Sequence, residues 1–150
     1  MTLSDRIKGE LRDVYDFPKP GIVFKDITPL LANPALRKEV AEHLAAELRP
    51  LKADALAAVE ARGFIFGVMI AHELGIPFIP VRKAGKLPFH KVTEEYDLEY
   101  GRAKIEMHND AFEKGSRIII HDDLLATGGT ASAAGRMIQH LGGEVAGYSF

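Results

Sequence analysis

Apolar residues recur every three or four positions in parts of this chain, which is the period of a helix that buries one face. The first such stretch has Ser4 as its cap and ends before Phe17, and its apolar face consists of Ile7, Leu11 and Val14. The second begins after Asn33, has proline in its first turn and ends at Pro50. Its apolar stripe consists of Leu36, Val40, Leu44 and Leu48. Both stretches are therefore predicted to be helices.

Short apolar runs elsewhere predict the strands of a central sheet. Strands are predicted over 53–59 and 76–81, on either side of a helix over 64–74 that closes near Gly75. A strand, a helix and a strand in this order indicate a parallel pair joined by a right-handed crossover. Two more strands are predicted over 100–107 and from Arg117, and a helix over 131–141 leads to a last strand that begins at Glu144.

The stretch between 82 and 100 carries its charges in two blocks. Residues 82–91 contain four basic residues and no acidic ones, whereas residues 94–99 contain four acidic residues and no basic ones. Gly85 and Pro88 favour a long loop, and loops of this length without secondary structure are uncommon unless they are lids or binding loops. A solvated surface excursion fits the charge pattern equally well.

Composition narrows the class of protein. The chain has 150 residues, 47% of them hydrophobic, which is enough for the core of one domain. Its formal net charge of -2 provides no general attraction for nucleic acid or anionic lipid, so an anion site has to be built locally. There is no cysteine and no apolar stretch long enough for a membrane span, and we expect a cytoplasmic protein. The last predicted strand stops at Phe150, which suggests that C-terminal sequence is missing.

The run from Arg117 to Thr130 holds the most specific chemistry. Its three consecutive isoleucines, 118–120, are typical of a strand buried on both faces of a parallel sheet, and such strands place ligands at their carboxyl ends. Asp122 and Asp123 follow that end. Residues 126–130 then offer backbone N–H groups, two hydroxyls and two glycines before the positive end of a helix. The run predicts a site for a phosphorylated sugar.

Residues 118–130 closely resemble the phosphoribosyl-diphosphate signature of the type I phosphoribosyltransferases, in the form found in the adenine-using branch. The segments of nucleotide triphosphatase and dinucleotide-binding loops are absent from the chain. Three more segments resemble the same family in order: its purine-binding segment at 17–27, its diphosphate loop at 60–67 and its lid at 82–101. Two features depart from the family: His121 replaces a residue that is usually aliphatic, and the chain stops where members continue with a final strand and tail.

The resemblance implies a single α/β domain over 1–150. Its mostly parallel central sheet would be flanked by helices, with a small purine-binding hood at about 15–30 and a mobile lid loop at about 82–100. It also implies a strained or cis peptide near Ala61-Arg62. A homodimer is expected, with the basic lid meeting the diphosphate across the dimer interface.

The resemblance assigns roles to individual residues. It implies that the 5-phosphate is bound by Ala126, Thr127, Gly128, Gly129 and Thr130. The ribose hydroxyls would be bound by Asp122 and Asp123, directly or through magnesium, with Asp122 the stronger candidate. The diphosphate would be bound by Arg62, Gly63, Arg82, Lys83 and Lys86. The purine would be bound by the backbone of Val23 and Lys25 and by the ring of Phe24, with Glu99 as acid or base near N7. The catalytic set is therefore Glu99, Asp122, Asp123 and Arg62.

Each of these residues also has a structural interpretation. The Asp pair could cap a turn, Arg62 could be a buried structural arginine, and Val23 and Phe24 could be core residues. Arg82, Lys83 and Lys86 could belong to a surface charge run, as could Glu99 on spacing alone. His43 and Glu47 lie one helical turn apart but lack a third ligand nearby, so no metal site made by the protein alone is expected.

The activity implied is transfer of the 5-phosphoribosyl group from phosphoribosyl diphosphate to adenine, which gives AMP and diphosphate in purine salvage. Mg²⁺ is the expected cofactor, carried by the substrate's diphosphate and ribose, with Asp122 as the one candidate protein ligand. The alternatives are a 6-oxopurine as the acceptor base, or a regulatory domain that senses phosphoribosyl diphosphate. No helix-turn-helix segment and no basic footprint supports the regulator, so neither nucleic acid nor membrane is an expected partner.

Overall fold

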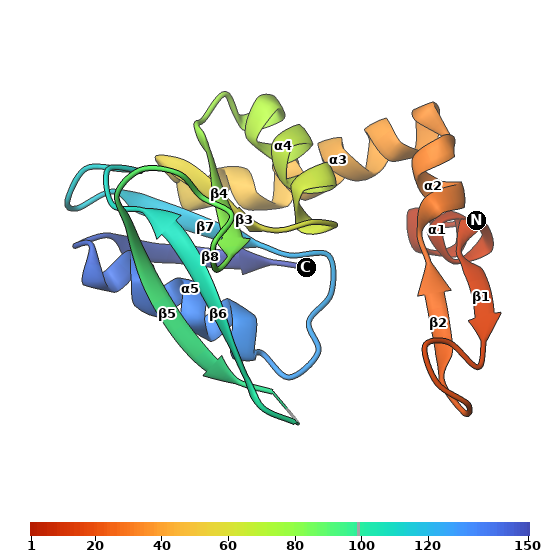
Figure 1. Ribbon diagram of the computed structural model, residues 1–150. Helices are drawn as coiled ribbons and strands as arrows, with labels where there is room; N and C mark the ends of the chain where they lie inside the picture. The colour runs from red at the N-terminus through yellow and green to blue at the C-terminus, as the bar shows by residue number, and fades with distance from the viewer. Residues whose placement is uncertain (99) are drawn as a thin grey trace. The chain divides into compact units, whose positions relative to one another are not determined.

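A computed structural model describes residues 1–98 and 100–150 of the chain (Figure 1). The chain divides into two compact units, Met1–His43 and Leu44–Phe150. The first unit contains α1 (Leu3–Glu10), β1 (Arg12–Tyr15), β2 (Val23–Asp26), α2 (Thr28–Ala32) and the start of α3 (Pro34–Leu48). β1 and β2 form an antiparallel hairpin in which Val14 lies opposite Phe24. β2 lies in the region predicted to be the hood, at about 15–30, whereas β1 precedes that region except for Tyr15.

The prediction for the first helix was wrong at both ends. Thr2, not Ser4, is the cap: its hydroxyl accepts the Asp5 N–H at 3.1 Å and its own N–H donates to the Asp5 carboxylate at 2.9 Å. This reciprocal pair fixes the first turn two residues earlier than expected. The helix ends at Glu10, and Val14 belongs to β1, because pairing with β2 overrides a helical spacing that rested on only three apolar residues.

The second predicted helix is confirmed. α3 runs over Pro34–Leu48, and the Asn33 side chain accepts the Leu36 N–H at 3.1 Å. Capping by Asn33 and a proline in the first turn both favour a helix start at this point. A single 3-10 turn, Arg49–Leu51, follows α3.

Among the described residues, the second unit contains the end of α3, one six-stranded sheet and two further α-helices. Its elements after the 3-10 turn are β3 (Ala55–Val59), α4 (Gly63–Leu74), β4 (Phe78–Lys83), β5 (Lys91–Asp97), β6 (Arg102–His108), β7 (Arg117–His121), α5 (Gly129–His140) and β8 (Glu144–Ser149). The strand order is β5-β6-β4-β3-β7-β8. β4, β3, β7 and β8 are parallel, while β6 is antiparallel to both of its neighbours. The predicted α/β fold with a mostly parallel sheet is confirmed.

The prediction of a long loop without secondary structure over 82–100 was wrong. Residues 91–97 form β5, which pairs with β6 from Lys91 opposite His108 to Asp97 opposite Arg102. Val92 and Tyr96 pack against the core while Thr93 and Glu95 point outward, so the strand alternates as half-buried strands do. The four acidic residues hid this alternation in the sequence. Arg82 and Lys83 end β4, and the connecting loop spans only 84–90.

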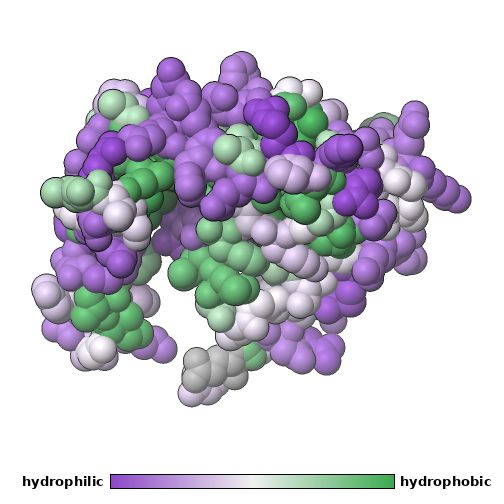
Figure 2. Space-filling model, turned by 180° about the vertical axis from the view of Figure 1, so that it is seen from behind, coloured by the Kyte–Doolittle hydropathy of each residue, from purple (hydrophilic) through white to green (hydrophobic). Residues whose placement is uncertain are grey.

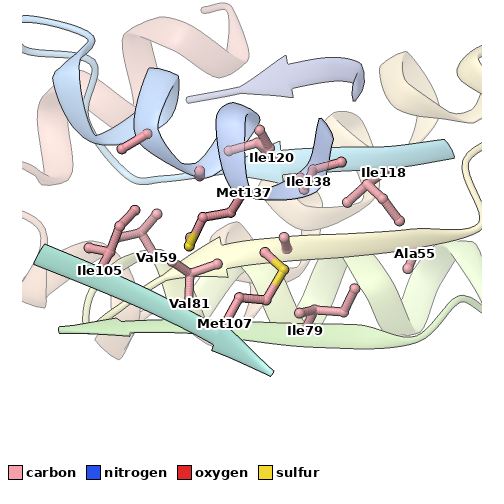
Figure 3. Packing of buried hydrophobic residues seen from close by; sticks show 13 residues of the cluster. Ala55, Val59, Ile79, Val81, Ile105, Met107, Ile118, Ile120, Met137 and Ile138 are labelled. Atoms are coloured by element: carbon pink, nitrogen blue, oxygen red, sulfur yellow. The ribbon is translucent and has the colours of Figure 1, made fainter. Parts of the chain in front are cut away.

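The core of this unit lies on both faces of the sheet. Alternate residues of the central strands, such as Ala57 and Ile120, pack against Met137 and Ile138 of α5 (Figure 3). The opposite face carries α4, where a Cβ on Gly67 would lie 2.7 Å from the Ala58 Cβ. Because successive strand residues point to opposite faces, α4 and α5 cover opposite sides of the sheet. Ile118, Ile119 and Ile120 are fully buried, as their β-branched run predicted.

No helix among the residues that the structure describes is long and apolar enough to span a membrane.

Candidate active site

The candidate site lies at the carboxyl ends of three neighbouring parallel strands. β4, β3 and β7 are adjacent in the sheet and run in the same direction, so the residues that follow them meet at one edge. Arg62 and Gly63 follow β3, Asp122 and Asp123 follow β7, and the basic residues end or follow β4. Segments far apart in the sequence are therefore brought to the same edge of the sheet.

The two carboxylates have different partners. The Asp123 Oδ2 lies 2.9 Å from the Arg62 Nε, and the Asp123 side chain is only 13% exposed. The Asp122 Oδ1 accepts the Asp123 N–H at 2.8 Å. The α4 backbone approaches closely at Gly63, where a Cβ would lie 3.1 Å from the Asp122 Oδ1 and 3.3 Å from the Asp122 Cα. The close approach at Gly63 is therefore to Asp122, and the predicted role of Gly63 at the diphosphate stays a prediction.

Asp122 has an altered acidity. The pKa of Asp122 is raised to about 6: burial is the largest cause, the Asp123 carboxylate also raises it, and the Asp123 N–H and the Arg62 guanidinium oppose the shift. A carboxylate that is costly to ionise, held beside a cation at a strand end, is typical of a functional position. At neutral pH Asp122 is ionised and can accept hydrogen bonds from hydroxyl groups.

The predicted phosphate loop connects β7 to α5. Gly128 stands at the cap position of α5 with a φ of 84°, and a glycine has no side chain to accept the first-turn N–H groups. The Thr127 hydroxyl accepts the Gly129 N–H at 3.3 Å. A pocket of about 60 Å³ is lined by Asp122, Phe150 and residues 124–131, which include all five predicted phosphate residues. The pocket thus joins the loop to one of the two carboxylates.

The basic residues after β4 surround a carboxylate that sequence reasoning did not single out. The Glu60 side chain is only 6% exposed and lies 3.3 Å from the Arg82 Nε and 3.1 Å from the Lys86 Nζ. Its Oε1 also accepts the Lys83 N–H at 2.5 Å. Burial favours the neutral acid, but the Lys83 N–H, Lys86 and Arg82 outweigh it and lower the pKa of Glu60. The one available signal was its position directly after a buried strand.

The predicted purine residues lie in the first unit, on β2. Val23 lies opposite Tyr15, and the Lys25 ammonium forms an ion pair with the Asp13 carboxylate. The Phe24 ring packs edge to face on Phe17 with centroids 5.2 Å apart. The predicted roles of the Val23 and Lys25 backbone and of the Phe24 ring stay predictions. Glu99, the predicted acid or base, lies outside the described residues.

His121 is buried at the end of β7. Its Nδ1 lies 3.0 Å from the Ser149 Oγ, and its Nε2 has no hydrogen-bond partner among the described residues. Burial lowers the pKa of His121 to about 4, against smaller opposing effects of Asp123 and Ser149, so the ring is neutral at neutral pH. The same Ser149 accepts the Asp122 N–H on its carbonyl oxygen at 3.1 Å. The departure from the family pattern therefore adds a contact between β7 and β8.

Two further expectations bear on this edge of the sheet. The structure has a cis peptide between Glu60 and Ala61, one residue before the place that the resemblance indicated. Within 1–98 and 100–150, no three His, Asp or Glu side chains gather in a group that could hold a metal ion.

Comparison with known proteins connects this geometry to a family. Residues 26–148 match the model of the phosphoribosyl transferase domain. An adenine phosphoribosyltransferase of Cytophaga hutchinsonii is 57% identical over 148 residues, which cover 99% of this chain and 82% of that protein. The crystal structure of adenine phosphoribosyltransferase from Thermoanaerobacter pseudethanolicus superposes with a TM-score of 0.91 at 50% identity, over 96% of this chain and 83% of that one.

A more distant structure agrees over the same length. The Saccharomyces cerevisiae adenine phosphoribosyltransferase was crystallised with an imino-altritol bisphosphate and adenine. It superposes with a TM-score of 0.90 at 36% identity, over 99% of this chain and 89% of that one. The fold that carries the strand-end carboxylates and the glycine loop is therefore shared with these enzymes. The chain is a member of the phosphoribosyl transferase domain family and, within it, of the adenine phosphoribosyltransferases.

Proposed function

We propose that this chain transfers the 5-phosphoribosyl group of phosphoribosyl diphosphate to N9 of adenine. The products are AMP and diphosphate, and the reaction salvages purines. The observation that carries the proposal is the Asp122-Asp123 pair, of which Asp123 contacts Arg62 of the neighbouring strand end and Asp122 lines the pocket of the glycine loop. Relatives at 50% identity and above bear the name of this activity.

The phosphate loop would bind the 5-phosphate of the substrate. Gly128 has no side chain to cap the N–H groups of Thr130 and Ala131 in the first turn of α5, and the hydroxyls of Thr127 and Thr130 line the same pocket. An anion at this place gains backbone hydrogen bonds and the favourable end of the helix dipole. Ala126 and Gly129 complete the set by keeping the loop free of bulky side chains.

The two carboxylates would act on the sugar. Asp122 accepts hydrogen bonds from the ribose hydroxyls, and Asp123 holds Arg62 beside them. As the bond between C1 and the diphosphate oxygen breaks, its electron pair leaves with diphosphate and positive charge develops on the ring. Fixed negative charge beside that ring stabilises the transition state, and this electrostatic contribution is commonly the largest in enzymes.

The leaving diphosphate would be met by cations from two strand ends. Arg62 follows β3 with Gly63 behind it, and Arg82, Lys83 and Lys86 end or follow β4. Arginine presents a planar fork that matches phosphate oxygens, and lysine presents a compact charge. Together they would offset the negative charge that accumulates on the diphosphate as it departs.

Magnesium fits the donors that are present. Mg²⁺ prefers oxygen ligands and usually binds through one or two carboxylates together with the phosphates of the substrate. Asp122 is the candidate protein ligand, and Asp123 is less suited because its Oδ2 already pairs with Arg62. Bound magnesium would neutralise part of the charge of the diphosphate.

The first unit would supply the base site. Adenine offers an amine donor and ring-nitrogen acceptors, which the backbone groups of Val23 and Lys25 can read, while the Phe24 ring supplies an apolar surface. Glu99 would exchange a proton with N7, which eases loss of the proton on N9 as the new bond to C1 forms. We further propose that residues 1–150 act as one domain, that the chain forms a homodimer, and that it works in the cytoplasm.

A substrate panel tests the proposal. The purified chain is incubated with phosphoribosyl diphosphate, Mg²⁺ and one of adenine, hypoxanthine, guanine or xanthine, and nucleotides are separated by chromatography. We expect AMP from adenine, and loss of turnover when a chelator removes the magnesium. Preferential use of hypoxanthine or xanthine would replace adenine by an oxopurine. Absence of turnover with every base, together with tight binding of phosphoribosyl diphosphate, would favour a regulatory domain instead.

The same assay assigns the carboxylates. Asp122→Asn keeps the shape of the side chain and removes its charge, so we expect kcat to fall by about a hundredfold or more, as when one preorganised electrostatic group is lost. Asp54→Asn is a matched control: Asp54 lies at the opposite end of β7, where its carboxylate accepts the Arg117 N–H at 2.8 Å. We expect that control to turn over substrate at the rate of the unaltered chain.

A further inference from the structure

Glu60 lies among the basic residues to which the diphosphate is assigned, yet it carries the same sign of charge as the ligand. Its carboxylate contacts Arg82 at 3.3 Å, Lys86 at 3.1 Å and the Lys83 N–H at 2.5 Å. With 6% exposure it is far more buried than its partners, since Arg82 is 36% and Lys86 50% exposed. The carboxylate is thus the inner member of a cluster whose cations reach the surface.

The sheet itself fixes Glu60 in this place. The Glu60 N–H donates to the Val81 carbonyl at 2.9 Å, which continues the parallel pairing of β3 with β4 for one more residue. The side chain is therefore anchored at the strand end, while Lys86 lies in the connecting loop. A fixed acceptor limits the rotamers that Arg82 and Lys86 sample before a ligand arrives. Less conformational entropy is therefore lost when these side chains bind it.

The contacts leave the cations able to bind a second anion. A guanidinium has five N–H donors and an ammonium has three, more than the two oxygens of one carboxylate accept. One Arg82 Nη donates to the Lys86 carbonyl at 3.4 Å, while the Arg82 Nε lies 3.3 Å from the Glu60 Oε1 without forming a hydrogen bond to it. Their exposed ends lie at the same strand edge as Arg62 and the Asp pair.

A purely structural tie is the competing interpretation. Ion pairs whose cations are a third or more exposed usually contribute little to stability. A stability role alone therefore does not account for a buried carboxylate that faces two cations of the candidate diphosphate site. Directing these cations toward a ligand accounts for both features.

We propose that Glu60 is a positioning residue for the diphosphate of phosphoribosyl diphosphate: it holds Arg82 and Lys86 at the carboxyl edge of the sheet, so that their remaining donors meet the ligand in a prepared arrangement. The proposal rests on the proposed function, which supplies the diphosphate. Glu60 itself makes no bond to the substrate and takes no part in proton transfer.

Glu60→Gln is the test variant, because the amide oxygen can still accept the Lys83 N–H while the charge that holds the two cations is lost. We expect KM for phosphoribosyl diphosphate to rise by about tenfold, the loss of roughly one charge-assisted hydrogen bond, while kcat and KM for adenine change less than about twofold. The affinity for magnesium diphosphate, measured by calorimetry, should fall by the same factor. Glu60→Asp, which keeps the charge, should recover part of the loss in KM for phosphoribosyl diphosphate and part of the loss in affinity for magnesium diphosphate.

Glu106→Gln is the matched control. Glu106 is also buried and accepts hydrogen bonds from the Gly85 N–H of the same loop at 2.6 Å and from the Thr93 hydroxyl of β5 at 3.0 Å, but neither donor is charged. It should leave KM for phosphoribosyl diphosphate unchanged even where it lowers the melting temperature. A double-mutant cycle with Lys86→Met adds a second criterion, since the two changes should cost less together than the sum of each alone.

The outcomes separate the two proposals. If the unaltered chain makes no AMP, the proposed function fails. If it does make AMP but Glu60→Gln matches Glu106→Gln in KM and in diphosphate affinity, Glu60 does not position the cations. A lower KM in Glu60→Gln would mean that the carboxylate competes with diphosphate, and additive costs in the cycle would mean that it does not act through Lys86. Either result would overturn the inference.

Discussion

Burial disfavours the charged form of Asp122, and the neighbouring groups at the strand edge stabilise that form only in part. The Asp122 side chain is half-buried under the Gly63 backbone, and the Asp123 carboxylate is its neighbour in sequence and in space. Arg62 offsets the charge of the pair, but its Nε contacts Asp123. A group that costs stability when ionised and is needed in that form for binding sugar hydroxyls is a common compromise at active sites.

The cost of ionising Asp122 predicts a pH-dependent effect of Asp122→Asn on stability. The native state raises the pKa of Asp122 from 3.8 to about 6, so its contribution to the free energy of unfolding is complete below the unfolded value and is lost as the pH rises through about 6. Asparagine carries no charge at any pH. We expect the variant to gain on the order of 1 kcal/mol relative to the unaltered chain at about pH 8, after allowance for solvent screening, and nothing at about pH 4.

Urea unfolding curves at the two pH values measure this difference. Asp110→Asn serves as control, because Asp110 is exposed in the turn after β6, and its effect should be the same at both. An Asp122→Asn variant that is less stable than the unaltered chain at about pH 8 would show that the hydrogen bond to the Asp123 N–H outweighs the burial of the charge.

Gly63 gives a second prediction for a single residue. In Gly63→Ala the new methyl would lie 3.1 Å from the Asp122 Oδ1 and 3.3 Å from its Cα, and because backbone is involved the carboxylate has to shift. Displacement of a positioned group by a fraction of an ångström to one ångström predicts a loss of about tenfold to a hundredfold in kcat/KM. Steady-state kinetics with phosphoribosyl diphosphate measures it.

Gly9→Ala is the control for Gly63→Ala. Gly9 lies within α1, and nothing stands within 4 Å of the position of its Cβ. Alanine favours a helix over glycine by about 0.5–1 kcal/mol, so this variant should be slightly more stable and fully active. Equal kinetics for the two alanine variants would contradict the role of the close contact at Asp122.

At the scale of elements, the start of α5 determines how the site meets a phosphate. Gly128 has a φ of 84°, a conformation in which alanine costs about 1–2 kcal/mol, and its N–H belongs to the predicted phosphate loop. We expect Gly128→Ala to weaken the binding of ribose 5-phosphate more than about tenfold, because the loop amides rotate away from the anion. Isothermal titration calorimetry measures the affinity.

Gly142 offers a closely matched control at the other end of the same helix. It has the same φ of 84°, and the nearest atom to its would-be Cβ is the flexible Lys114 side chain at 3.0 Å. Gly142→Ala should lose comparable stability and keep its affinity for ribose 5-phosphate. If both variants lose affinity alike, the effect comes from general destabilisation of α5.

The elements also show where sequence is informative. α3 was predictable because cap, proline and apolar stripe all lie within one contiguous stretch. β5 was not, since its alternation of Val92 and Tyr96 is overlaid by four acidic residues and becomes a strand only through pairing with β6. β1 was read as helix because three spaced apolar residues fit either period until β2 supplies a partner.

The same reasoning applies to the site. The Asp pair and the phosphate loop form one contiguous segment, and contiguous segments can be recognised from sequence. The pairing of Arg62 with Asp123, the burial of Glu60 between β3 and β4 and the contact of His121 with Ser149 each depend on the order of strands in the sheet. The local sequence pattern does not specify the order of the strands, so these contacts could be identified only in the folded chain.

At the scale of the whole molecule, α3 contributes residues to both compact units, because the boundary between His43 and Leu44 falls inside this continuous helix. Separate unfolding of one unit would have to break the helix in its middle, where turns are most cooperative. We therefore expect a single transition in urea for the secondary structure of both units. Hydrogen exchange followed by mass spectrometry checks this, and separate protection classes for β1–β2 and β3–β4 would contradict it.

The surface bears on the expected homodimer. Large apolar side chains are exposed in the second unit on α4, in the phosphate-loop segment and at the end of β8: Val68, Leu124, Leu125, Tyr148 and Phe150. On the face in Figure 2, hydrophobic areas alternate with hydrophilic ones. A net charge of -2 gives little repulsion between copies, so burying such side chains in an interface is not opposed by charge.

We expect static light scattering during size-exclusion chromatography to give twice the chain mass of 16.5 kDa. A dilution series should show specific activity falling as the dimer dissociates, because the lid is expected to need support from the neighbouring copy. A monomer with full specific activity at every concentration would contradict the expected homodimer.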